Sequence, residues 1–240
     1  MCGMCSRRGL IIGAIAASIA PSFVSAADTA LPCGCDADEF TQRYSTRTSK
    51  SGDNRFDAAL VEELKFIKQI MPSINPGFQF VKAHNAFTTR ETVVLGTDAT
   101  VWIGIEFVHN LIATRTTGDD GGIAVAGVLA HECAHVHQLA SNSLLQDLRS
   151  QTSAVLFELH ADFLAGFYLA RKRNVTPEKL TAMQRVFAYT GTTYDRNNPK
   201  YHGTPGLRGA AMDSGYFAAA DGKSFMQASE IGAKYVRGLV

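Results

Sequence analysis

The chain has 240 residues, of which 46% are hydrophobic and 19% are charged, enough to build a substantial core within one domain. The 23 basic and 22 acidic residues nearly cancel and leave a net charge of +1. This balance provides no electrostatic basis for binding nucleic acid or an anionic membrane surface, so we expect neither partner. The chain also lacks the glycine pattern of a Rossmann or P-loop nucleotide site.

The first residues have the three parts of an export signal. Paired arginines at positions 7 and 8 precede an apolar stretch over residues 10–20, and a small-residue cleavage pattern ends at Ala26. The arrangement resembles a twin-arginine signal, with Leu10 in place of the usual Phe. We expect residues 1–26 to direct export to the periplasm or cell exterior, and no stable membrane span after signal removal. An ordinary secretory signal and an uncleaved anchor are the alternatives.

Three cysteines, Cys33, Cys35 and Cys133, would remain after removal of the signal. Cys33 and Cys35 are too close in sequence for an unstrained disulfide with each other. An odd number of cysteines in an oxidising compartment leaves a free thiol or an intermolecular bond. Metal binding by Cys33 and Cys35 stays open as an alternative, although no second cysteine or histidine pair lies at finger-like spacing.

The first half of the chain contains the predicted strands. Residues 27–54 are polar with little periodicity, and we expect a loosely ordered segment there. A single domain is expected over residues 55–240. It begins with a helix, three short strands and a second helix, predicted at residues 55–70, 78–81, 92–95, 100–105 and 106–114.

The second half of the chain is predicted to be mostly helical. In a loop over residues 114–122, Asp119 or Asp120 is expected to cap the next helix. Helices are predicted at residues 121–140, 144–173, 177–189, 206–219 and 224–240. Residues 191–203 are polar and rich in turn-forming residues. A few strands followed by many helices indicate an α+β fold with a small sheet.

The strongest motif is His131-Glu132-Cys133-Ala134-His135, which has the form H-E-x-x-H within a predicted helix. Residues four apart on a helix are rotated by about 40°, so both imidazoles point to one side and are able to share a metal ion. Glu132 is rotated by about 100° from His131, where its carboxylate is placed to take a proton from a metal-bound water. The alternative is an ordinary helix with two buried histidines.

A catalytic zinc site needs a third protein ligand and an open position for water. Glu158 is the best candidate, and Asp162 follows four positions later on the same helical face. Ala154, Ala161 and Ala165 share that face, and carboxylates among alanines are expensive to bury unless positive charge lies opposite. We expect Glu158 to bind the metal and Asp162 to accept the free N–H of a ligand imidazole. The alternative is an exposed carboxylate pair.

The double motif, His-Glu-x-x-His followed by Glu-x-x-x-Asp, resembles that of the gluzincin zinc metallopeptidases. Residues 131–138 and 158–166 are similar to the bacterial neutral zinc metallopeptidases, whose motif continues as His-Glu-x-x-His-x-x-Gln. A likeness to CAAX-prenyl-protease-like peptidases rests on Asn-Ala-Phe at residues 85–87 and on the spacing of His202 and Arg208. In this chain a glycine replaces the proline that usually follows that histidine.

The resemblance implies a zincin-like fold and a peptidase acting on peptide or protein substrates. It implies Zn²⁺ held by His131, His135 and Glu158, with Glu132 as the general base. Retention of Glu132 favours an enzyme over a non-catalytic zinc-binding relative that binds a partner, because a structural site has no use for that carboxylate. Another zinc-dependent amide or ester hydrolase is the remaining alternative.

The resemblance also implies the groups around the reacting carbonyl. His202 would donate to the developing oxyanion, steadied by Arg208, with Tyr201 as the substitute donor. A strand over residues 101–105 would lie beside the cleft and pair with an extended substrate.

Other residues that attract notice are expected to have structural roles. His137 and Cys133 point away from the metal-binding side of their helix, and His160 lies off the face that carries Glu158. His84 and His109 have no partner at a useful spacing, and Trp102, the one tryptophan of the sequence, is expected in the core.

Overall fold

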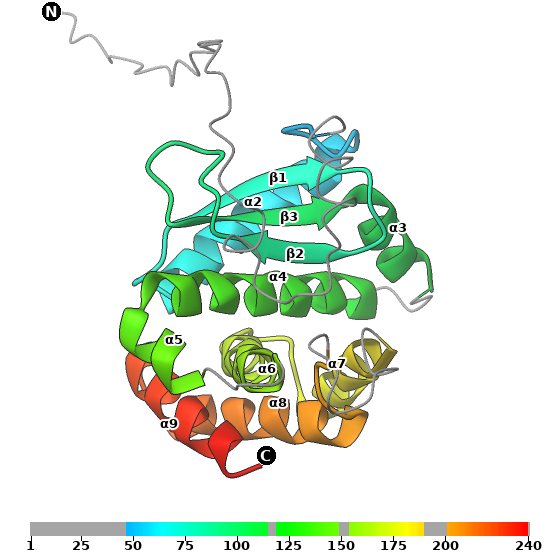
Figure 1. Ribbon diagram of the computed structural model, residues 1–240. Coiled ribbons are helices and arrows are strands. Elements are labelled where there is room, and N and C mark those ends of the chain that lie inside the picture. Colours follow the sequence, from blue (N-terminus) through cyan, green and yellow to red (C-terminus); the bar gives the residue numbers. More distant parts are fainter. Residues whose placement is uncertain (1–46, 115–118, 149–153, 190–200, 240) are drawn as a thin grey trace, which may run out of the picture.

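This computed structural model describes residues 47–114, 119–148, 154–189 and 201–239, and it contains a three-stranded sheet. The strands are β1 (Pro76–Val81), β2 (Ala86–Thr89) and β3 (Ala99–Gly104), in the spatial order β1-β3-β2 (Figure 1). β3 pairs in parallel with β1 and antiparallel with β2. The α+β prediction is confirmed at this level, because a small sheet is combined with a mostly helical remainder.

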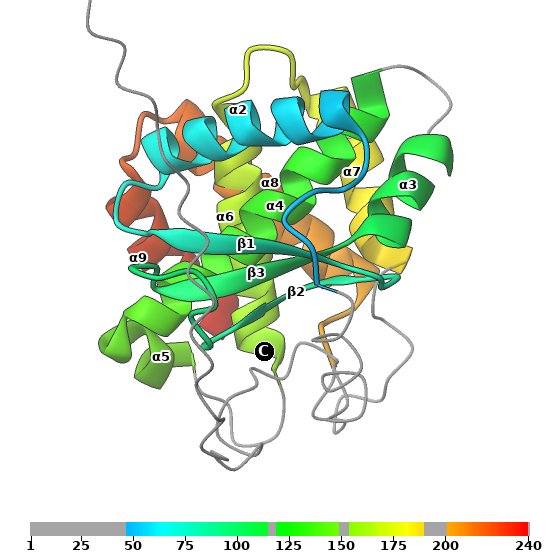
Figure 2. The same cartoon turned by 90° about the horizontal axis from the view of Figure 1, so that it is seen from above.

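The helices are arranged around α4, which lies between the sheet and the helices that follow it (Figure 1). Their bounds are α2 (Asn54–Ile70), α3 (Ile105–Thr114), α4 (Asp119–Ala140), α5 (Asn142–Leu148), α6 (Val155–Ala170), α7 (Pro177–Tyr189), α8 (Pro205–Ala220) and α9 (Phe225–Arg237). Seen from above, α2 and α3 flank the sheet and α6 passes beneath α4 (Figure 2). None of the helices in the described ranges is both long and apolar enough to span a membrane.

α4 is covered on both sides, which explains why its sequence has no clear polar face. Ala130, Cys133, Ala134 and Val136 are fully buried on different sides of the helix. Toward the sheet, α4 contacts β2 and β3, and on its other side it contacts α6 and α7. The motif histidines therefore lie in the middle of the molecule, on an element held from two directions.

α6 and α8 meet backbone to backbone at two glycines. A side chain at Gly166 would overlap the backbone oxygen of Met212, and one at Gly215 would overlap the backbone oxygen of Phe163. Most of α6 is buried, including Glu158. This close approach determines how the ligand-bearing helix lies relative to α8.

Replacing Gly215 with alanine is expected to lower the free energy of unfolding by about 1–3 kcal/mol, because the added methyl group forces the two helices apart. Urea unfolding followed by circular dichroism measures the change. Gly209→Ala on the same helix is the matched control. A Cβ there would make only ordinary contacts, 3.6 Å from the Gln184 side chain, and alanine favours the helix. Equal stabilities of the two variants would contradict the packing argument.

Two of the predicted elements are wrong. Residues 92–95 do not form a strand; they belong to an irregular loop in which Leu95 is 97% exposed and Gly96 has a φ of +77°. β3 instead pairs with β2, which was not predicted. The helix predicted over residues 144–173 is two helices, α5 and α6, because α5 packs against the end of α4 and α9 whereas α6 crosses α4.

Several predictions concern residues outside the described ranges. The export signal over residues 1–26, Cys33, Cys35 and most of the segment 27–54 lie there. The side chains of Asp119 and Asp120, predicted to cap α4, are likewise outside the described side chains. The helix predicted from residue 55 is present as α2, and its N-terminus is capped by the Asp53 carboxylate.

Candidate metal centre

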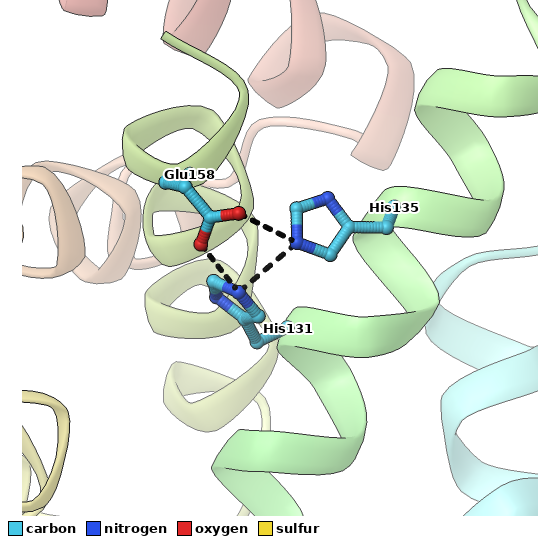
Figure 3. Close-up of side chains that lie close together, drawn as sticks. All are labelled: His131, His135 and Glu158. Carbon is cyan, nitrogen blue, oxygen red and sulfur yellow. Dashed lines mark hydrogen bonds and ion pairs between the residues drawn. The ribbon is translucent and has the colours of Figure 1, made fainter. Parts of the chain in front are cut away.

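Three predicted ligands from two helices meet in the core of the protein. His131 and His135 project from α4, and Glu158 projects from the first turns of α6 toward them (Figure 3). The two Nε2 atoms are 3.1 Å apart. Glu158 Oε2 lies 3.3 Å from His131 Nε2, and Glu158 Oε1 lies 3.6 Å from His135 Nε2. All three side chains are buried.

These separations are the ones a tetrahedral metal site requires. Metal–ligand bonds of about 2.0–2.1 Å place neighbouring ligand atoms about 3.3 Å from one another around zinc. Within the described ranges, His131, His135 and Glu158 form the one group of histidines, cysteines and carboxylates able to hold a metal ion. The structure therefore has a buried group that could bind a metal ion, of a chemical type that suits zinc.

His131 contacts Asp162, as predicted, and Asp162 in turn binds Arg208, which was not predicted. Its Nδ1 lies 2.9 Å from Asp162 Oδ1, although the ring N–H does not point straight at that oxygen. Asp162 is fully buried and receives two hydrogen bonds from Arg208, from Nε at 2.7 Å and from Nη2 at 2.8 Å. The Arg208 guanidinium also donates to the backbone oxygen of Phe187 at 3.1 Å. Arg208, predicted to steady His202, thus binds Asp162.

The charges around the ligands favour a cation between them. Burial lowers the pKa of His131, but the carboxylates of Asp162 and Glu158 raise it to about 10. Burial raises the pKa of Glu158, but His202, His135 and His131 together bring it well below its usual range. Burial likewise opposes ionisation of Asp162, and the Arg208 guanidinium outweighs it and lowers that pKa. The site keeps two ionised carboxylates in the core, which a metal ion would balance.

His135 has a different outer partner, Gln138, the last residue of the His-Glu-x-x-His-x-x-Gln motif, for which no role was predicted. His135 Nδ1 lies 2.8 Å from Gln138 Oε1, and both side chains are fully buried. Gln138 lies one turn after His135 on α4, at an i,i+3 spacing that places the two side chains on one face. That spacing was the available signal for this contact.

Glu132 follows His131 on α4, and its carboxylate is oriented by the sheet. The Thr88 hydroxyl, from β2, is 2.8 Å from Glu132 Oε2 and 3.0 Å from the Glu132 backbone oxygen. Both residues are buried. Because Ala86 and Thr88 face α4 while Phe87 stacks on Trp102 on the other side of the sheet, β2 presents this hydroxyl to the motif helix.

Tyr201 and His202 lie just before α8 and have polar atoms without a hydrogen-bond partner among the described residues. These atoms are the Tyr201 hydroxyl oxygen and His202 Nε2, and both are buried. His202 is close enough to Glu158 to lower that residue's pKa. The turn continues through Gly203, which has a φ of +99°. Proline cannot adopt this angle, because its ring fixes φ at about −65°, which explains why glycine occupies this position. Thr204 then caps α8.

The histidines expected to be structural lie away from the ligands. His137 Nε2 is 2.9 Å from Ser229 Oγ, and His160 Nε2 is 3.0 Å from the Ser229 backbone oxygen, on α9. His84 pairs at the surface with Glu106 at 2.9 Å. Burial raises the pKa of the Cys133 thiol, which is enclosed in the core.

The prediction that the strand over residues 101–105 pairs with substrate is wrong. Residues 101–104 belong to β3, the central strand, which has β1 on one side and β2 on the other. Its backbone hydrogen-bonding groups are therefore already used. Trp102, on the same strand, donates from Nε1 to Thr89 and packs in the sheet, consistent with a structural role.

Comparison with known proteins found no matching family model, no similar curated protein and no similar solved structure.

Proposed function

We propose that the protein is a zinc-dependent peptidase of gluzincin type, with a zincin-like fold, exported by its N-terminal signal to the periplasm or cell exterior. The observation that carries the proposal is the tetrahedral spacing of His131, His135 and Glu158, with a carboxylate, Glu132, next to the first ligand in sequence. A structural zinc site is usually closed by four protein ligands, whereas three leave a position for water. The arrangement therefore favours catalysis.

Zinc, when bound, would lower the pKa of a coordinated water and polarise a substrate carbonyl. Glu132 is the general base in this proposal: its carboxylate takes the proton of the attacking water and later passes it to the leaving amine. The Thr88 hydroxyl holds Oε2 of this carboxylate and so determines its orientation. Proton transfer depends on such geometry as much as on pKa.

The oxyanion that forms on the substrate carbonyl needs a donor other than the metal. His202 and Tyr201 are the proposed donors, because each has a buried polar atom without a partner among the described residues. The proposed substrate is a peptide or protein, because these groups are suited to hydrolysis of a peptide bond. Hydrolysis of another amide or of an ester would use the same groups of the protein.

The metal site is tested by measuring zinc per chain in the purified protein. We expect one zinc ion per wild-type chain, and loss of most of it in His131→Ala and Glu158→Ala, because two ligands do not hold catalytic zinc tightly. His84→Ala is the matched control, since His84 is exposed and paired with Glu106. Absence of zinc from the wild-type chain, or retention in both ligand variants, would contradict the proposed function.

A further inference from the structure

A chain of hydrogen bonds runs from His135 through the core to α9. Gln138 Oε1 is 2.8 Å from His135 Nδ1, and Gln138 Nε2 is 2.9 Å from the Phe157 backbone oxygen and 3.0 Å from His160 Nδ1. His160 Nε2 is in turn 3.0 Å from the backbone oxygen of Ser229. Gln138 and His160 are fully buried, so no bulk solvent competes for these groups.

Two backbone carbonyls determine the direction of every hydrogen bond in this chain, because a carbonyl oxygen only accepts. The Phe157 oxygen requires a donor, so the Gln138 nitrogen must face it and the Gln138 oxygen must face His135. The Ser229 oxygen requires His160 Nε2 to donate. His160 Nδ1 then accepts the second proton of the Gln138 amide, and both ends of the chain lead to the same arrangement.

The direction of these hydrogen bonds determines which nitrogen of the metal ligand His135 is protonated. Because the Gln138 oxygen faces His135 Nδ1, that nitrogen must carry the proton, and the lone pair of the ring is left on Nε2. Nε2 is the atom that faces Glu158 and His131. The neutral network behind His135 thus selects the tautomer that a metal requires.

We propose that Gln138 is a positioning residue of the metal centre, which holds His135 in its metal-binding tautomer and orientation and is itself oriented by His160 and the Phe157 carbonyl. This inference rests on the proposed function, since it assumes that the site binds zinc.

The two histidine ligands then have outer partners of different charge. His131 is backed by Asp162, whose charge Arg208 balances, whereas His135 is backed by a neutral amide. With Glu158 as the anionic ligand, zinc, its three protein ligands and the Asp162–Arg208 pair would together carry one net positive charge. A carboxylate at position 138 would cancel that charge and weaken the metal as a Lewis acid.

The test compares zinc affinity in Gln138→Met and Ser229→Ala, measured by competition with a chromophoric zinc chelator. Gln138→Met keeps an unbranched side chain of similar length but removes the acceptor for His135, and we expect zinc binding to weaken by about 10–100-fold. Ser229→Ala removes the hydroxyl that contacts His137 but leaves the backbone oxygen that His160 uses. We expect its zinc affinity to stay within about twofold of wild type, by the same reasoning.

A second measurement does not depend on how well the variants fold. In zinc-loaded wild-type protein labelled with ¹⁵N-histidine, the His135 Nδ1 proton should exchange slowly with water, because it is hydrogen-bonded and buried. Rapid exchange of that proton, or unchanged zinc affinity in a folded Gln138→Met variant, would overturn the inference while the metal site stands. A wild-type chain that binds no zinc would overturn the proposed function itself, so the two failures are distinguishable.

Discussion

Replacing Glu132 with glutamine is expected to leave one zinc ion bound and to lower kcat for peptide hydrolysis by about 10²–10⁴-fold. The glutamine amide has nearly the volume of the carboxylate, and its oxygen is able to accept the Thr88 hydroxyl as Oε2 of Glu132 does. It is not able to take a proton from water at neutral pH. The substitution therefore removes the base and preserves its surroundings.

The measurement combines zinc analysis with hydrolysis of an unspecific peptide mixture, scored by the appearance of new amino termini. Glu106→Gln is a suitable control, because Glu106 is a partly exposed carboxylate paired with His84 at the surface. Its kcat and zinc content should match those of the wild type. A zinc-loaded Glu132→Gln protein with wild-type turnover would reject Glu132 as the general base and leave the metal site intact.

Replacing Arg208 with methionine is expected to lower the free energy of unfolding by about 3–5 kcal/mol, the cost of removing one partner of a buried ion pair, because Asp162 then keeps only His131 as a positive partner. Asp162 is fully buried, and Arg208 provides two hydrogen bonds to its carboxylate as well as one to the Phe187 backbone oxygen. Without the guanidinium, the pKa of Asp162 should rise, because Arg208 is the main group that lowers it against burial.

Urea unfolding of metal-free protein at neutral pH measures this effect without a contribution from zinc binding. Arg237→Met is the matched control: Arg237 pairs with Asp147 at 3.5 Å, and both side chains are about half exposed. Exposed pairs of this kind contribute about 0–1 kcal/mol, so the control should unfold near the wild-type midpoint. Similar midpoints for the two variants would contradict the role given to Arg208.

The buried ion pair also links stability to the proposed chemistry. Asp162 lies between Arg208 and His131, so the group that stabilises α8 against α6 also contacts a metal ligand. Loss of Arg208 should therefore weaken zinc binding as well as folding. Loss of Gln138 should affect zinc binding more than folding, because its network is neutral and ends on backbone carbonyls.

Local spacing predicted the components of the metal centre well, because helix geometry alone decides which neighbours share a face. His131 with His135, and Glu158 with Asp162, follow from an i,i+4 spacing on two predicted helices. The distance between those helices does not follow from spacing. It depends on the contacts of α4 with α6 and on the close packing of α6 against α8 at Gly166 and Gly215.

The errors in the predicted elements have one physical cause, which is that the structure of a segment also depends on what packs against it. Residues 92–95 have strand-like composition, yet Leu95 is exposed, and β2 is the segment that pairs with β3. The segment over residues 144–173, predicted as one helix, contains parts of both α5 and α6, which pack against different neighbours.

The amino-acid sequence by itself determined the donor atoms and the fold class. It supplied two imidazoles and a carboxylate at helical spacing, a second carboxylate one turn later, and strands before helices. Only the tertiary structure decided which partner completes each group: Arg208 for Asp162, Thr88 for Glu132 and Gln138 for His135. The contacts of Arg208 and Thr88 join segments far apart in the chain, which residue spacing does not reveal. Gln138 and His135 have a suitable i,i+3 spacing, but burial and the direction of their hydrogen bond decide that they pair.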